Sequence, residues 1–260
     1  MAECLWVDMS IFSIQNKTAI VVGGSGDLGV EIVEGFLEEG ARVVILDKQK
    51  ISSDKENFFS KSNFSFKYIQ TDLFSDESIQ TSFDEALKFL DNKLDILVNS
   101  AGIQARTISN EFPLSDWDKV LRINLTAAFQ LSKLASNSMI KNNFGRIINI
   151  ASMQSFLGGV TIPAYAASKG GIAQLTKAFS NDLAEKGITV NAIAPGYMDT
   201  QLNIAIRNDP IREKEILSRI PKGRWGNGKD LKGLAIFLAS DSSEYITGSI
   251  IPVDGGFLSR

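Results

Sequence analysis

The 260-residue sequence contains no histidine and a single cysteine, Cys4, and these shortages exclude several classes of enzyme. A Ser-His-Asp hydrolase, a Cys-His protease and a zinc site with His and Cys ligands cannot be built within this chain. One cysteine also supplies no disulfide framework, which favours a reducing compartment. Any chemistry must therefore use serine, tyrosine, lysine, asparagine or carboxylate side chains, and we expect no metal site.

The sequence also has no concentration of one charge and no long hydrophobic run. The formal net charge is -3 and the basic residues are scattered, which argues against nucleic-acid binding. No apolar run approaches the ~18 residues that span a bilayer. The first ten residues carry Glu3 and Asp8 in place of the positive charge of a signal peptide. We therefore expect a cytoplasmic protein that acts on a small molecule, with no membrane or nucleic-acid partner.

Short β-branched runs alternate with longer amphipathic stretches, a rhythm typical of βα units. The runs are almost entirely apolar, as expected for parallel strands covered by helices on both faces. The sequence therefore predicts an N-terminal extension, 1–13, and one α/β domain, 14–260, with a Rossmann-like doubly wound parallel sheet of about seven strands. The expected strands are Thr18–Val22, Arg42–Leu46, Phe64–Ile69, Leu94–Val98, Arg146–Ile150, Thr189–Ile193 and Ser249–Val253. The expected helices are Leu28–Glu39, Asp76–Leu90, Ser115–Lys141, Pro163–Glu185 and Asp230–Ala239.

The segment 200–226 interrupts the alternation of strands and helices. It is polar, contains Arg207, Arg212 and Arg219, and lies between the sixth expected strand and the last expected helix. Long insertions at the carboxyl edge of such a sheet usually serve binding. We therefore expect a small mobile lid over a substrate pocket, with a plain surface excursion as the alternative.

A glycine-rich loop follows the first expected strand and opens the first helix. It contains GxGxxG at Gly24, Gly26 and Gly29, where backbone N–H groups could approach a pyrophosphate at a helix N-terminus. Such a loop can be only a turn, but the second strand is followed by Asp47, about 20 residues on, where dinucleotide folds place an acid on the adenosine ribose. A carboxylate there favours NAD(H) over NADP(H), although Lys48 or Lys50 could reach a 2′-phosphate.

Two reactive side chains, Tyr165 and Lys169, are four residues apart on one face of an expected helix. Ser152 follows the fifth expected strand, and Asn124 lies in the preceding helix. Together with the glycine loop, this set resembles the short-chain dehydrogenase/reductase family over about residues 14–260. The resemblance implies a catalytic tetrad in which Tyr165 is the general base, Ser152 bonds the substrate oxygen, Lys169 binds the nicotinamide ribose and Asn124 positions the lysine through water.

The resemblance also implies a nicotinamide dinucleotide site. Its motifs include Asp72-Leu73, the NSAG run from Asn99 to Gly102, and Pro195-Gly196. The implied cofactor residues are Gly23, Ser25, Asp27, Leu28, Gly29, Asp47, Asp72, Leu73, Asn99, Ala101, Tyr165, Lys169, Pro195, Gly196, Met198 and Thr200. The loop departs from the family's TGxxxGxG at Val22 and Asp27, so that Asp27 must point away from the pyrophosphate.

Tyrosine has an ordinary pKa near 10 and is a weak base at neutral pH. Lowering that pKa by about 2 to 3 units requires roughly 3 to 4 kcal/mol. An ammonium group about 4 Å away supplies about 4 kcal/mol at an effective dielectric constant of 20. We therefore expect Lys169 to be sufficient to activate Tyr165.

Within the family, the stretch Ile147–Lys169 resembles 2-deoxy-D-gluconate 3-dehydrogenases, 2-dehydro-3-deoxy-D-gluconate 5-dehydrogenases and gluconate 5-dehydrogenases. A sugar-acid substrate needs a cation, and we expect Arg106 to meet its carboxylate, with possible help from a lid arginine. Gln154 and Met153 follow the catalytic serine and should face the pocket. The competing interpretations are a 3-oxoacyl-type or other carbonyl reductase and a catalytically silent NAD-binding protein.

The resemblance further implies a homo-oligomer, most simply a tetramer. Small residues on the Tyr165 helix would permit close packing across a two-fold axis; they are Ala164, Ala166, Ala167, Gly170 and Gly171. The alternative is that they pack within the subunit.

Overall fold

The computed structural model describes residues 11–62 and 64–260, in which parallel strands form one continuous sheet. The strands are β1 (Thr18–Val22), β2 (Arg42–Asp47), β3 (Phe66–Gln70), β4 (Ile96–Asn99), β5 (Gly145–Ile150), β6 (Ile188–Pro195) and β7 (Ile250–Val253). They lie in the order β3-β2-β1-β4-β5-β6-β7, and every neighbouring pair is parallel. The expected doubly wound parallel sheet is therefore confirmed.

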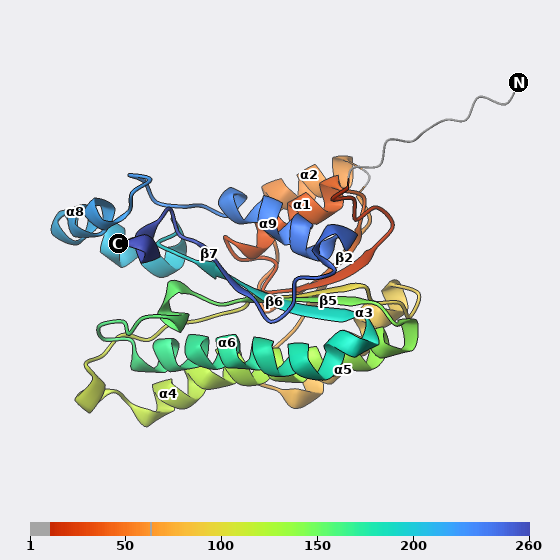
Figure 1. Ribbon diagram of the computed structural model, residues 1–260, viewed down its shortest axis with the longest axis horizontal. Helices are drawn as coiled ribbons and strands as arrows, with labels where there is room; N and C mark the ends of the chain where they lie inside the picture. The colour runs from red at the N-terminus through yellow and green to blue at the C-terminus, as the bar shows by residue number, and fades with distance from the viewer. Residues whose placement is uncertain (1–10, 63) are drawn as a thin grey trace, which may run out of the picture.

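Helices cover both faces of the sheet (Figure 1). One face is covered by α1 (Gly29–Glu38), α2 (Ser53–Lys61) and α9 (Lys229–Ala239). The other is covered by α3 (Asp76–Phe89), α4 (Leu114–Leu121), α5 (Ala127–Asn142) and α6 (Pro163–Leu183). Two further helices, α7 (Ile204–Arg207) and α8 (Pro210–Arg219), lie in the segment after β6. Helix α8 is at the left end of the molecule in Figure 1. The chain order reverses between β1 and β4, the place where α/β sheets bind ligands beyond the carboxyl ends of their strands.

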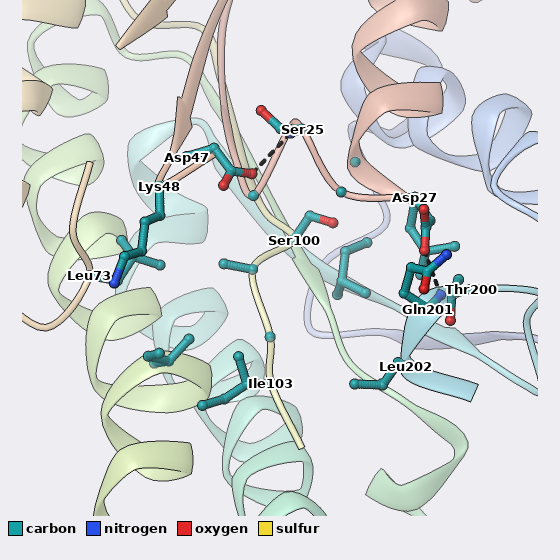
Figure 2. A pocket seen from close by; sticks show the side chains of 18 of the residues that line it. Ser25, Asp27, Asp47, Lys48, Leu73, Ser100, Ile103, Thr200, Gln201 and Leu202 are labelled. Atoms are coloured by element: carbon teal, nitrogen blue, oxygen red, sulfur yellow. Dashed lines mark hydrogen bonds between the residues drawn. The ribbon is translucent and has the colours of Figure 1, made fainter. Parts of the chain in front are cut away.

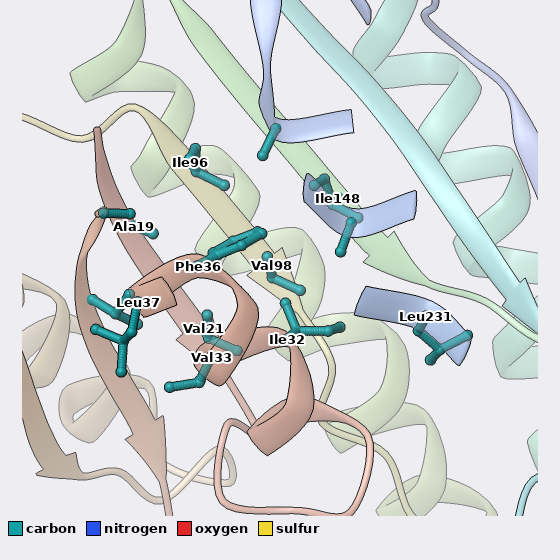
Figure 3. Close-up of a cluster of buried hydrophobic side chains, with 14 of the residues drawn as sticks. Ala19, Val21, Ile32, Val33, Phe36, Leu37, Ile96, Val98, Ile148 and Leu231 are labelled. Atoms are coloured by element: carbon teal, nitrogen blue, oxygen red, sulfur yellow. The ribbon is translucent and has the colours of Figure 1, made fainter. Parts of the chain in front are cut away.

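The core is apolar on both sides of the sheet. Ile32 and Phe36 of α1 lie against Val98 of β4 in a fully buried cluster (Figure 3), and Leu231 brings α9 into it. Leu131 and its neighbours on α3 and α5 cover the opposite face. Burial of this kind stabilises a domain by about 25 cal/mol per Å² of apolar area, so it holds the strand ends in fixed positions.

Helix α2 was not expected from the sequence. Its nine residues, SDKENFFSK, are mostly polar, and only Phe59 is buried, where its ring meets that of Phe66 at 5.4 Å. The local signal is an N-cap: the Ser52 hydroxyl accepts a hydrogen bond from Lys55 N at 3.4 Å, and acidic residues follow in the first turn. A helix with one anchoring residue gives too weak a periodicity to be recognised by pattern.

The single helix expected over Ser115–Lys141 is divided in the structure. A π-helical turn, η2 (Arg122–Thr126), separates α4 from α5. Such turns insert one residue into the helical repeat and are frequent at functional sites. This one contains Asn124, which the resemblance assigns to the catalytic tetrad.

Candidate active site

A cavity of about 550 Å³ lies across the carboxyl ends of β1, β2, β4, β5 and β6. Its size lies within the range of ligand pockets in proteins. It is lined by every cofactor residue that the resemblance implies except Asn99. Figure 2 shows Ser25 and Asp27 on one wall, Asp47 and Lys48 at one end and Thr200 near the other.

The loop after β1 is shaped by close backbone approaches. Gly23 has a φ of 74°, and a Cβ there would lie 2.5 Å from Ala101 N, so only glycine fits. The hydroxyl Oγ of Ser25 is buried and has no hydrogen-bond partner among the described residues. A phosphate or ribose hydroxyl would satisfy that group, so the loop fits a dinucleotide.

The carboxylate of Asp47 is held at the end of β2 by two backbone groups. Its Oδ2 accepts a hydrogen bond from Ser25 N at 3.0 Å, and its Oδ1 accepts one from Gln49 N at 3.0 Å (Figure 2 shows the first). Asp47 therefore connects the glycine loop to the strand that would carry the adenosine ribose. Lys48 lines the cavity beside it, and both Lys48 and Lys50 are exposed.

Asn99 lies behind the cavity instead of in its wall, which corrects the cofactor contact expected for its side chain. Its amide nitrogen Nδ2 donates to Ser132 Oγ at 3.0 Å and to Asn149 Oδ1 at 2.8 Å. Asn149 in turn donates to Thr176 Oγ1 at 3.0 Å. Asn99 therefore ties β4, β5, α5 and α6 together beneath the site, because its strand register points it into the sheet's helical cover.

The catalytic candidates come together at one end of the cavity. Ser152 follows β5 and is 6% exposed, and it forms a hydrogen bond with the Tyr165 hydroxyl. Lys169 is 3% exposed, its Nζ lies 5.7 Å from the centre of the Tyr165 ring, and it donates to the Ile150 carbonyl oxygen at 2.6 Å. These three side chains converge on the cavity wall from β5 and α6.

The electrostatics of this corner differ from the expectation for Lys169. Burial raises the pKa of the Tyr165 hydroxyl, and the groups that lower it are Ser152, by a hydrogen bond, and Arg106, by its charge. Burial lowers the pKa of Lys169 to about 8. Lys169 is not among the groups that lower the pKa of Tyr165, and its ammonium group donates to the Ile150 carbonyl oxygen. A nicotinamide group that bound in this cavity would supply the hydride acceptor or donor.

Asn124 is 2% exposed and holds the loop after β4 by two hydrogen bonds. Its Oδ1 accepts from Ile103 N at 2.8 Å, and its Nδ2 donates to the Ile103 carbonyl oxygen at 2.9 Å and to Ser168 Oγ at 3.1 Å. The π-helical turn therefore aims Asn124 at the backbone next to the cavity. Asn124 also links that loop to α6 between Tyr165 and Lys169.

Two of the expected substrate residues, Arg106 and Gln154, lie outside the lining of the cavity, whereas Ser152 and Tyr165 line it. Arg106 is exposed, and its charge interacts with Tyr165 and Tyr197, while desolvation lowers its own pKa. The next residue, Thr107, donates its N–H to the Thr161 carbonyl oxygen at 2.9 Å, which ties this loop to the segment before α6. Gln154 turns toward Gly159 and its Oε1 is buried without a partner among the described residues.

Met153 does not face the cavity as expected. It is 5% exposed and packs with Ile216, Ile220 and Phe257. This cluster packs α8 and the C-terminal turn against the residue that follows Ser152. An apolar side chain at this position is better stabilised in the cluster than in a polar pocket.

The arginines of the expected lid have different surroundings. Arg207 pairs with Asp199, and Arg219 lies over the Phe257 ring at 4.1 Å. Arg212 is exposed, and its charge lowers the pKa of Arg106. Among residues 11–62 and 64–260, neither Arg106 nor Arg212 forms an ion pair. Arg106, whose charge acts on Tyr165, and Arg212, whose charge acts on Arg106, are therefore two cations without acidic partners among the described residues.

Several residues of the cavity wall were not expected from the sequence. Ile103 and Ile123 line it from the two sides of the Asn124 contact, and Gln201, Leu202 and Asn203 line it from the segment after β6. They carry no motif of their own. Their only signal was proximity in sequence to Asn124 and Thr200.

No helix in the described part of the chain is long and apolar enough to cross a membrane. No group of three or more His, Cys, Asp or Glu residues there could hold a metal ion.

Comparison with known proteins identifies the family. A family profile described as Enoyl-(Acyl carrier protein) reductase matches residues 24–258. That profile belongs to the short-chain dehydrogenases/reductases, and together with the sheet order and the Ser152, Tyr165 and Lys169 arrangement it shows that this chain is a member of that family and an oxidoreductase.

Particular relatives cover almost the whole chain. The 2-dehydro-3-deoxy-D-gluconate 5-dehydrogenase of Bacillus subtilis is 43% identical over 249 residues, 96% of this chain and 97% of that protein. The Pseudoalteromonas atlantica protein of the same name is 44% identical, over 96% of this chain and 98% of its own length. A structure of a gluconate 5-dehydrogenase from Burkholderia cenocepacia in complex with NADP and tartrate has a TM-score of 0.90 and 35% identity, and covers 97% of this chain and 99% of that one.

Proposed function

We propose that this protein interconverts a secondary alcohol and a ketone on a sugar acid such as a deoxy-gluconate, with NAD(H) as its cofactor. The observation that carries the substrate proposal is Arg106, a cation without an ion-pair partner among the described residues whose charge acts on Tyr165, with Arg212 near enough to act on Arg106. Guanidinium is the side chain best suited to bidentate recognition of a carboxylate. The names of the Bacillus and Burkholderia relatives, both acting on gluconate-type acids, support the same class.

The roles of the tetrad follow from its contacts. Ser152 and Tyr165 can both hydrogen-bond the substrate oxygen, and Tyr165 exchanges the hydroxyl proton with it. Lys169 holds a positive charge at the bottom of the site, and Asn124 fixes the loop that forms the adjacent wall. Burial raises the pKa of Tyr165, and the hydrogen bond from Ser152 and the charge of Arg106 lower it. An oxidised nicotinamide bound in the cavity would add a further positive charge that favours the tyrosinate.

The preference for NAD(H) rests on Asp47. Its carboxylate is fixed by Ser25 N and Gln49 N, so it cannot easily turn away from a 2′-phosphate. The structure of the Burkholderia relative contains NADP, so the preference of this chain is decided by comparing the two cofactors directly. We expect kcat/KM for NAD⁺ to exceed that for NADP⁺ by about tenfold or more, the size of one lost charge-assisted contact. An NADP⁺ value equal or higher would show that Lys48 or Lys50 governs the ribose pocket.

The substrate proposal is tested by following reduction of NAD⁺ with a panel of sugar acids and their neutral polyol counterparts. Arg106→Ala should lower kcat/KM for the best acid by about tenfold to a hundredfold, the loss of one hydrogen bond to a charged group of about 1.5 to 3 kcal/mol. Neutral polyols should lose far less, and Arg106→Lys should recover part of the loss. Equal losses on acids and polyols would contradict the proposed role of Arg106.

Oligomeric state, cytoplasmic location and the 1–13 extension remain predictions. Residues 1–10 lie outside the described residues. Of the small residues on α6, Ala164 is fully buried and a Cβ on Gly171 would meet Leu125, so these two pack within the subunit. A Cβ on Gly170 would meet nothing within 4 Å, and Ala167 is exposed, so this part of α6 is open to a second copy.

A further inference from the structure

Asp27 connects two parts of the cavity wall that are far apart in the sequence. Its Oδ2 accepts a hydrogen bond from the backbone N–H of Gln201 at 2.8 Å. Figure 2 shows Asp27 beside Gln201 and Thr200 at the wall of the cavity. Asp27 belongs to the loop that opens α1, and Gln201 begins η5 (Gln201–Asn203), the first turn of the lid.

The lid's first turn has few other attachments to the nucleotide-binding half. The Asn203 side chain donates to the Met198 carbonyl oxygen at 2.9 Å, which closes the turn on itself. Asp199 N donates to the Gly226 carbonyl oxygen at 2.7 Å, which holds the turn to the far end of the lid. The bond from Gln201 to Asp27 is therefore the hydrogen bond that fixes this turn against the glycine loop.

Charge makes Asp27 an unexpected residue for this place. It stands where the family pattern has glycine, its backbone needs no left-handed conformation, and none of the ion pairs in the described residues includes it. The N-terminus of α1 favours a carboxylate, but it equally favours the pyrophosphate that the same loop would bind. The two negative groups would compete for one positive helix end.

We propose that Asp27 is a positioning residue that fastens the lid to the glycine loop, and that its charge weakens pyrophosphate binding as a consequence. The fastening holds Thr200, the residue before Gln201, at the cavity wall. The hydrogen bond and the charge are separable, because each can be removed without the other.

Three variants separate them. Asp27→Asn keeps an acceptor oxygen and removes the charge. Gln201→Pro removes the N–H and keeps the charge of Asp27; it suits the backbone, since Thr200 is extended, at φ -142° and ψ 163°, and Gln201 is the first residue of a helical turn. Asp27→Gly removes both, and Gln201→Ala is the matched control that removes a side chain and keeps the N–H.

The lid is followed by its rate of cleavage by trypsin, which has sites at Arg207, Arg212, Lys214, Arg219, Lys222 and Arg224. Cleavage there should be faster by about fivefold or more in Gln201→Pro and Asp27→Gly, from the loss of one hydrogen bond of about 1 kcal/mol. Asp27→Asn and Gln201→Ala should be cleaved at the wild-type rate. Wild-type cleavage of Gln201→Pro, or equally fast cleavage of Asp27→Asn and Asp27→Gly, would overturn the fastening role.

The charge is followed by calorimetric binding of ADP-ribose, which carries the pyrophosphate but no nicotinamide. Its affinity should rise by about threefold to tenfold in Asp27→Asn and Asp27→Gly, because a repulsive charge near the helix end is removed. Gln201→Pro should bind ADP-ribose as the wild type does. An unchanged affinity in both Asp27 variants would overturn the second half of the proposal. Neither readout requires the sugar-acid substrate, so a failure here is distinct from a failure of the proposed function.

Discussion

The catalytic corner and the lid side of the same cavity are built differently. Lys169 and Asn124 are 3% and 2% exposed, and both are bonded to backbone groups of strands or of the adjoining loop. Across the cavity, Leu202 is 39% exposed and Arg212 is on the surface. The reaction is therefore fixed by buried residues on rigid elements. The lid side presents exposed side chains on short helices, where substitutions cost little stability.

The largest effect should come from the rigid corner. Tyr165→Phe removes the hydroxyl that Ser152 bonds and that we assign to exchange the substrate proton, so turnover should fall by about 10³-fold or more. NADH binding, measured by fluorescence, should stay within a few-fold of the wild type, because the ring and Lys169 remain. Tyr245→Phe is the control, since Tyr245 is fully exposed. A Tyr165→Phe enzyme with near wild-type turnover would contradict the assignment of the general base.

The buried charge of Lys169 should lower the free energy of unfolding of the protein. Burial lowers the pKa of Lys169 from 10.5 to about 8. Below pH 8 the lysine is charged in the folded and unfolded states, so the full cost of burying that charge is present. Between pH 8 and 10.5 the unfolded chain binds more protons than the folded one, and stability rises with pH.

Lys169→Met removes that buried charge and leaves an unbranched apolar side chain one atom shorter. At pH 7 it should unfold with a free energy up to about 3 kcal/mol above the wild type, while losing activity. The gain should shrink as the pH is raised toward 10.5. Lys177→Met, an exposed position on the same helix, should show neither change. Denaturant unfolding at pH 7 and pH 9.5 measures both, and a Lys169→Met protein no more stable than the wild type at pH 7 would refute the buried-charge cost.

The rigid half of the molecule was also the half that the sequence predicted well. Each of the seven expected strands is present, because continuous β-branched runs in a βα alternation have few other solutions. The tetrad converged because Ser152, Tyr165 and Lys169 lie at strand and helix positions that such a sheet brings to one edge. The π-helical turn at Asn124 could not be predicted, since one inserted residue leaves the hydrophobic pattern of α4 and α5 almost unchanged.

The lid side was predicted only in outline. Its helices are marked in the sequence only by short capping signals. Asp209, for example, caps α8 by accepting hydrogen bonds from Ile211 N at 3.0 Å and Arg212 N at 3.2 Å. The orientation of each lid arginine depends on contacts between distant segments. Arg219, for example, lies over the ring of Phe257, which is 38 residues further along the chain. The bond between Asp27 and Gln201 joins residues 174 positions apart and has no sequence signal.

The smallest expected effect is that of replacing Arg212, and this substitution tests whether the lid side contributes to substrate selection. Arg212 lies one turn before Ile216 on α8, so both are on the helix face that packs toward Met153 and Tyr197. Arg212→Ala should lower kcat/KM for the sugar acid by about threefold to tenfold, since an exposed charge acts through solvent, and the loss should diminish in 0.5 M salt. Arg219→Ala, which removes an arginine engaged with Phe257, is the matched control and should not depend on salt in this way. If both variants lose the same activity at both salt concentrations, the lid contributes stability alone, and substrate choice lies entirely with Arg106 and the rigid corner.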